Sequence, residues 1–140
     1  MYRRRQTAPE VELSACFANN DGFWERRGHM TEEKMRKAVE KFAEEIKKIY
    51  GTKLIEAILY GSCARGDFSP DSDIDVMILL NVSMDEINEE RKRIYDTSDK
   101  LDLEYDVVFA PVFQNYQVYQ ECMAVSVFYQ NIQKEGIKIV

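Results

Sequence analysis

The sequence has little cysteine, a single histidine and no long apolar run, and each shortage argues against a class of protein. Cys16, Cys63 and Cys122 are widely spaced and odd in number, so they predict neither a disulfide framework nor a zinc site. No stretch approaches the roughly 20 consecutive apolar residues that a transmembrane helix needs. We therefore expect a soluble protein in the reducing environment of the cytoplasm.

The lone histidine, His29, lies outside the segments that show helical or strand periodicity. Its position argues against zinc chemistry and against a nucleophile triad that depends on histidine. The 25 acidic residues outnumber the 19 lysines and arginines, which gives a net charge of −6. General nucleic-acid binding needs a basic surface, so we expect no nucleic-acid partner.

What remains is a chain of 140 residues with 45% apolar and 31% charged residues, which is typical of one globular domain. Residues 1–29 lack periodicity, and Pro9, Glu10 and Glu12 interrupt the apolar stretch that a signal peptide would need. We interpret residues 1–29 as a flexible N-terminal extension and residues 30–140 as the folded domain.

From Thr31 onwards, apolar residues recur with the periods of helices and strands. Thr31 suits a helix N-cap and Gly51 a helix end, which predicts a helix between them. Ser83-Met84-Asp85-Glu86 has the capping-box pattern and predicts a second helix that runs to about Lys100. The other predicted elements are strands at 54–60, 73–80, 101–109 and 137–140, a short helix after residue 61, and helical structure with one break at 113–134. The alternation predicts an α/β (α+β) domain with a small mixed β-sheet flanked by helices, with strand 73–80 in a central position.

Two aspartates, Asp73 and Asp75, open the otherwise apolar strand at 73–80. Residues two apart in a strand point to the same face, so the two carboxylates project together. Burying such a pair is costly unless a positive charge lies between the carboxylates. Arg65, the nearby cationic residue, cannot serve both carboxylates, whereas a divalent metal can. Ligation by oxygen alone favours Mg²⁺ or Mn²⁺ over zinc.

A candidate phosphate site lies just upstream, where Gly61-Ser62 ends one predicted strand and begins a short helix. Glycine allows a ligand to approach the backbone, the serine adds a hydroxyl, and a helix N-terminus presents free N–H groups to an anion. Arg65 and the turn at Gly66 are close enough in sequence to reach the same phosphates. The lysine of a P-loop is missing, so this is a different kind of phosphate site.

The string GSCARGDFSPDSDID at residues 61–75 joins these pieces, with ten residues between Gly61-Ser62 and Asp73-Ile74-Asp75. This spacing resembles the motif of the DNA polymerase beta-like nucleotidyltransferase superfamily. The full string is similar to that of its minimal nucleotidyltransferase (MNT) branch, whose members pair with HEPN-domain proteins as toxin–antitoxin modules. The resemblance covers about residues 31–140 and implies the nucleotidyltransferase fold.

The resemblance also implies a third carboxylate on a neighbouring strand. The segment LDLEYDVVF at 101–109 offers Asp102, Glu104 and Asp106, all on one face if the segment is a strand. Asp106 is flanked by Tyr105 and Val107 and fits the superfamily pattern of an acid between apolar residues. We therefore predict Asp106 as the third carboxylate, with Glu104 as the alternative.

The implied reaction is a metal-dependent transfer of AMP from ATP to an acceptor hydroxyl, with pyrophosphate as the leaving group. Two Mg²⁺ ions, or Mn²⁺, would be held by Asp73, Asp75 and Asp106. Gly61 and Ser62 would hold the β- and γ-phosphates, and Arg65 would assist by its charge.

The acceptor implied by the MNT branch is a tyrosine of a HEPN-type partner, which gives the protein an antitoxin role. One alternative is a small-molecule acceptor, as in aminoglycoside nucleotidyltransferases, for which an acidic chain is suitable. Another is an antitoxin that acts by binding alone. The base preference, the identity of the partner and homo-oligomer formation all stay open at this point.

Overall fold

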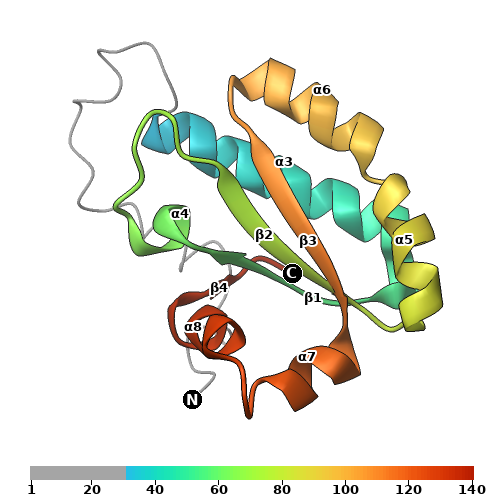
Figure 1. The fold of residues 1–140 in the computed structure, drawn as a ribbon. Helices are drawn as coiled ribbons and strands as arrows, with labels where there is room; N and C mark the ends of the chain where they lie inside the picture. The colour runs from blue at the N-terminus through green and yellow to red at the C-terminus, as the bar shows by residue number, and fades with distance from the viewer. Residues whose placement is uncertain (1–30) are drawn as a thin grey trace.

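The structure is a computed structural model that describes residues 31–140 (Figure 1). The predicted N-terminal extension at 1–29 lies outside the described residues. Within 31–140, no helix is both long and apolar enough to cross a membrane.

The first described helix, α3 (Glu32–Tyr50), begins and ends as the sequence predicts. The side chain of Thr31 accepts a hydrogen bond from the backbone N–H of Lys34, which caps the first turn. Gly51 follows the last turn with a φ of 53°, and its N–H donates to the carbonyl of Lys47. The inner stripe of α3 is buried and carries Met35, Ala38, Val39, Phe42, Ala43, Ile46 and Tyr50.

Within residues 31–140, four strands form one mixed sheet in the order β3-β2-β1-β4, which confirms the predicted fold class. The strands are β1 (Leu54–Tyr60), β2 (Ile74–Leu80), β3 (Phe109–Asn115) and β4 (Ile137–Lys138). β1 pairs antiparallel with β2 and β4, and β2 pairs parallel with β3. The apolar strand β2 is therefore interior, as predicted.

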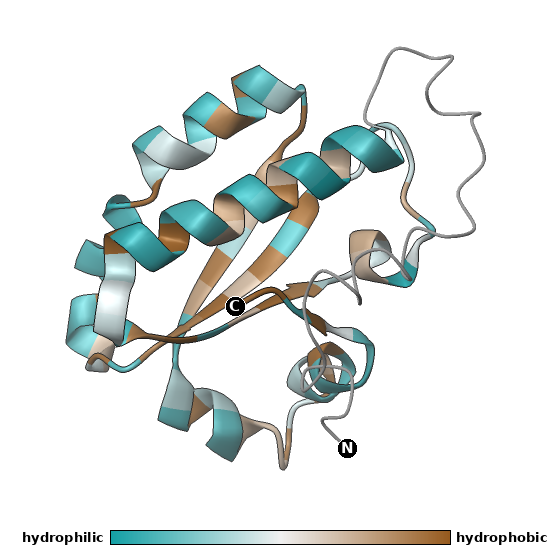
Figure 2. Ribbon diagram, turned by 180° about the vertical axis from the view of Figure 1, so that it is seen from behind, coloured by the Kyte–Doolittle hydropathy of each residue, from teal (hydrophilic) through white to brown (hydrophobic). Residues whose placement is uncertain are grey.

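Helices cover both faces of this sheet (Figure 1). On one face α3 packs against alternate strand residues such as Leu59, Val76 and Phe109, and α6 (Tyr95–Tyr105) lies beside it. The outer side of α3 is hydrophilic, and the strands behind it are largely apolar (Figure 2). On the other face a smaller cluster joins the sheet to α7 (Tyr116–Cys122) and α8 (Val127–Glu135). Its buried members are Ile58, Met77, Leu79, Tyr119 and Ile132.

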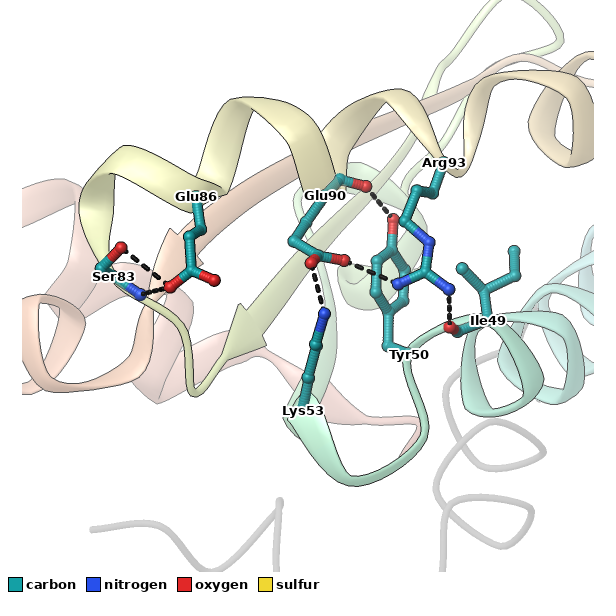
Figure 3. Close-up of polar contacts among 7 residues, drawn as sticks. All are labelled: Ile49, Tyr50, Lys53, Ser83, Glu86, Glu90 and Arg93. Carbon is teal, nitrogen blue, oxygen red and sulfur yellow. Dashed lines mark hydrogen bonds and ion pairs between the residues drawn. The ribbon is translucent and has the colours of Figure 1, made fainter.

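The helix predicted after Ser83 divides into two, α5 (Met84–Lys92) and α6. The predicted capping box is present, with Ser83 N–H donating to Glu86 Oε1 at 3.1 Å (Figure 3). Near the end of α5, buried Glu90 accepts hydrogen bonds from Lys53 Nζ at 2.6 Å and Arg93 at 2.9 Å (Figure 3). Glu90 thus ties α5 to the short 3-10 helix η2 (Gly51–Lys53) that precedes β1.

The strand predicted at 101–109 is wrong. Residues up to Tyr105 complete α6, Asp106 follows in the left-handed conformation with φ 56°, and the strand begins at Phe109. The alternation in LDLEYDVVF misled the prediction because a helix can also bury Leu101 while it exposes its neighbours. β3 continues through Pro111, which an edge strand tolerates because one side of β3 has no pairing partner in the described part of the chain. Residues 113–115, predicted as helical, therefore belong to the strand.

Candidate active site

The candidate site is built around the turn that leads from β1 to β2. The four-residue helix α4 (Ser62–Arg65) begins directly after Gly61, whose φ is 75°, and ends at Gly66, whose φ is 87°. Positive φ angles favour glycine because a Cβ would clash with the backbone. Cys63 and Ala64 are buried, so α4 is anchored on the core.

Asp75 lies directly against Gly61. A Cβ built on Gly61 would be 2.5 Å from Asp75 Oδ2, which is shorter than any ordinary contact. The strand register explains this approach, because Tyr60, the residue before Gly61, is paired with Asp75 across β1 and β2. The carboxylate of Asp75 and the start of α4 therefore lie next to each other.

The electrostatics of Asp75 favour a cation at this place. Burial raises the pKa of Asp75 above its ordinary value, and the negative charge of Asp73 raises it further, while Arg65 acts in the opposite direction. Asp75 is therefore harder to ionise than an isolated aspartate. A divalent cation bound by the two carboxylates would remove this penalty.

Arg65 is engaged by two acidic side chains. Its Nε lies 3.2 Å from Asp67 Oδ2, and its Nη1 lies 3.3 Å from Glu135 Oε1 in the last turn of α8. The guanidinium is 44% exposed, so these ion pairs are weak and exchangeable. The positive charge of Arg65 opposes the rise in the pKa of Asp75. Ser62 directly follows Gly61 and is the first residue of α4.

The three candidate third carboxylates lie at the end of α6 and just after it, and not on a strand. Asp106 is 70% exposed, and its Oδ2 lies 3.8 Å from Lys34 Nζ, so its position between Tyr105 and Val107 does not bury it. Glu104 is also exposed. Asp102 is half-buried, and its Oδ1 accepts the backbone N–H of Phe109 at 3.0 Å, which fixes the start of β3.

The carboxylates in the site therefore supply some of the ligands that a metal ion needs, but not a complete set. Asp73 and Asp75 supply adjacent oxygen ligands of the type that Mg²⁺ and Mn²⁺ prefer. Within residues 31–140, however, no group of three or more His, Cys, Asp or Glu side chains is arranged to hold a metal ion. The role of Asp106 in the site stays a prediction.

The sequence reasoning missed an aromatic group beside Asp75. Tyr60 packs edge-on against Phe128 of α8, with ring centroids 5.8 Å apart and planes at 85°. Phe128 also contacts Tyr129, which in turn contacts Tyr119. Tyr60 directly precedes the Gly-Ser turn in sequence, so its closeness to the site could have been inferred. Its partner Phe128 lies 68 residues further along, and no sequence pattern around Phe128 indicates that it lies near the site.

Paired carboxylates at the start of an interior strand, held against a glycine that opens a helix, define a site suited to nucleotidyl transfer. Residues 39–139 match the nucleotidyltransferase domain family, and this chain belongs to that family. The predicted superfamily is thereby confirmed. The protein is a nucleotidyltransferase.

Two proteins of Methanocaldococcus jannaschii are similar to this chain, and each is described as a "putative protein adenylyltransferase". One is 33% identical over 100 residues, which are 71% of this chain and 92% of the relative. The other is 31% identical over 101 residues, which are 72% of this chain and 94% of the relative.

A crystal structure of a mutant MntA–HpeT toxin–antitoxin pair also aligns with this chain, with 19% identity and a TM-score of 0.48. The alignment covers 72% of each chain. A TM-score below 0.5 does not establish a common fold, so nothing about partners follows from this likeness.

Proposed function

We propose that this protein is an adenylyltransferase that moves AMP from ATP to a tyrosine hydroxyl of a helical, HEPN-type partner and so acts as an antitoxin. The observation that carries the proposal is the contact of Asp75 with Gly61 at the start of α4, with Asp73 next to it. Membership of the nucleotidyltransferase family supports the reaction type. The description of both archaeal relatives supports a protein acceptor.

In the proposed reaction, the acceptor oxygen forms a bond to the α-phosphorus of ATP. The bond from that phosphorus to the bridging oxygen breaks, pyrophosphate leaves, and the proton of the acceptor hydroxyl passes to water. Mg²⁺ held by Asp73 and Asp75 would neutralise the triphosphate and lower the pKa of the attacking hydroxyl. Asp106 is the proposed third carboxylate, which requires its side chain to leave Lys34.

The residues of the β1–β2 turn bind the phosphates in this proposal. Gly61 allows close approach of the β- and γ-phosphates, and the hydroxyl of Ser62 donates a hydrogen bond to them. Arg65 exchanges its two carboxylate partners for the triphosphate, whose higher charge attracts it more strongly. Catalysis then consists mainly of positioning and charge stabilisation.

The test is intact-mass spectrometry of a HEPN-type partner after incubation with this protein, ATP and Mg²⁺. The expected result is an increase by one or more AMP units, absent with Asp73→Asn/Asp75→Asn. An inhibited but unmodified partner would instead indicate an antitoxin that acts by binding. An unmodified partner together with an adenylylated aminoglycoside would indicate a small-molecule enzyme.

A further inference from the structure

The aromatic group next to the carboxylates contains one ring that is poorly buried. Tyr119 is buried and Tyr60 and Tyr129 are partly buried, whereas Phe128 is 50% exposed. An exposed aromatic ring on its own needs no explanation. Here, however, the ring of Phe128 packs on Tyr60, the residue that is paired with Asp75 across the two strands.

Strand geometry fixes the side of the sheet on which these groups lie. Directly paired residues of antiparallel strands project their side chains to the same face, with Cβ atoms about 5 Å apart. Tyr60 and Asp75 are such a pair, so the tyrosine ring stands beside the carboxylate on the face covered by α7 and α8. Tyr60 is therefore the strand partner of Asp75 and also contacts the ring of Phe128 edge-on.

The order of these groups matches the order of groups in a nucleotide. In a nucleoside triphosphate, the ribose separates the α-phosphate from the base. In the structure, Tyr60 links the two corresponding groups, because it is paired with Asp75 and packs edge-on against the exposed ring of Phe128. A base is flat and has a π-face, and stacking on an exposed aromatic ring is a common way to bind it.

We propose that Phe128 is the surface on which the base of the bound nucleotide stacks, and that Tyr60 holds Phe128 in position beside the carboxylates. The inference rests on the proposed function, because it assumes that a nucleoside triphosphate occupies the site. It assigns base binding to α8, the helix that also carries Glu135, the partner of Arg65. α8 would then contribute to the nucleotide site at both of its ends.

The experiment compares two ligands that differ in the base. The affinities of ATP and of inorganic tripolyphosphate, each with Mg²⁺, are measured by calorimetry on the full chain. Phe128→Ala is expected to weaken ATP binding about tenfold, as loss of one stacking contact does, and to leave tripolyphosphate binding unchanged. Phe128→Trp should restore ATP binding, because it restores an aromatic surface.

Val127→Ala is the matched control, since Val127 is the neighbouring residue of α8 and is 69% exposed. It should change neither affinity. Tyr60→Leu should weaken ATP binding like Phe128→Ala, because it removes the ring that supports Phe128, whereas Tyr60→Phe should not. Circular dichroism of each variant establishes that it is folded.

Each contrary result has its own meaning. If Phe128→Ala bound ATP as tightly as the parent, the inference would be overturned. If this variant in addition raised the KM for the acceptor, the ring of Phe128 would be a contact for the acceptor. Equal losses for ATP and tripolyphosphate would also overturn it, because the phosphates carry no base. A parent protein that binds neither ligand would overturn the proposed function itself.

Discussion

The carboxylate of Asp75 and the backbone of Gly61 are so close that a single added carbon on Gly61 would lie 2.5 Å from Asp75 Oδ2. The contact joins the two halves of the motif, which are separated by more than ten residues in sequence. It means that the carboxylate and the helix start are positioned relative to each other by direct contact. A small change at either residue should therefore affect the chemistry of the whole site.

The first prediction concerns Gly61→Ala. The alanine must adopt a φ of 75° with a ψ of −156°, a conformation essentially restricted to glycine that costs about 1–3 kcal/mol, and its Cβ must displace the carboxylate of Asp75. A displacement of about 1 Å at a reacting group can reduce the rate about 100-fold. We expect a loss of AMP transfer of that order, measured as kcat/KM.

The matched control is Gly51→Ala, because Gly51 also has a positive φ, 53°, but a Cβ added to it has no atom of the described residues within 4 Å. This variant should lose stability alone, and an active Gly61→Ala enzyme would contradict the assigned site.

The second prediction concerns the cost of ionising Asp75 when no metal is bound. Burial and Asp73 raise the pKa of Asp75, so the folded protein holds its proton more tightly than the unfolded chain does. The contribution of this group to stability is present below the ordinary aspartate pKa of about 3.9 and is lost as the pH rises through the raised pKa. Asp75→Asn should therefore be as stable as the parent or more stable at pH 7 in the absence of Mg²⁺. This advantage should shrink as the pH falls towards 4. Chemical unfolding at several pH values measures it, and an unfolded variant would show that the carboxylate is structural.

The third prediction distinguishes the roles of the three acidic residues near the end of α6. Asp106→Asn should reduce AMP transfer by about 100-fold or more, as the loss of a group that assists proton removal does, while Mg²⁺–ATP still binds. Its stability should change by less than about 1 kcal/mol, because the ion pair with Lys34 is exposed. Asp102→Ala should cost about 1–2 kcal/mol of stability, since the N–H of Phe109 loses its acceptor. Glu104→Gln is the control and should change neither property. If Glu104→Gln abolished transfer and Asp106→Asn did not, the assignment would pass to Glu104.

The fourth prediction concerns the polar contacts of Glu90 at the opposite end of β1 from the site (Figure 3). Glu90 is 6% exposed, and its hydrogen bonds to Lys53 and Arg93 lower its pKa. Glu90→Gln should lower the free energy of unfolding by about 2 kcal/mol, as expected for hydrogen bonds to charged groups. Because the folded pKa is lowered, this contribution is present above the ordinary glutamate pKa of about 4.3 and is lost as the pH falls below it.

Glu89→Gln is the control for this variant, since Glu89 is exposed and pairs only with Lys92 among the described residues. It should leave stability unchanged. Both variants should keep full AMP transfer. A selective loss of activity in Glu90→Gln would mean that these contacts act on the site through the sheet.

The local elements were predictable because their determinants are contiguous. Four determinants each lie within a short window of sequence: the cap at Thr31, the apolar stripe of α3, the Gly-Ser turn, and the two aspartates at the start of β2. The segment around Asp106 was not predictable in this way. Its alternating apolar residues suit a strand or a helix, and packing decides between them: Leu101 is buried in α6, and Phe109 stacks on Phe42 with ring centroids 4.4 Å apart.

The sequence by itself determined the superfamily, the mixed sheet and the pair Asp73 and Asp75, because residue type, spacing and period are properties of the chain. Only the tertiary structure decided what surrounds that pair. It brought Phe128 onto Tyr60 and Glu135 onto Arg65, which are 68 and 70 residues apart in sequence, and it left Asp106 exposed beside Lys34. Such contacts depend on how α6 and α8 pack against the rest of the fold, and no local pattern specifies that packing.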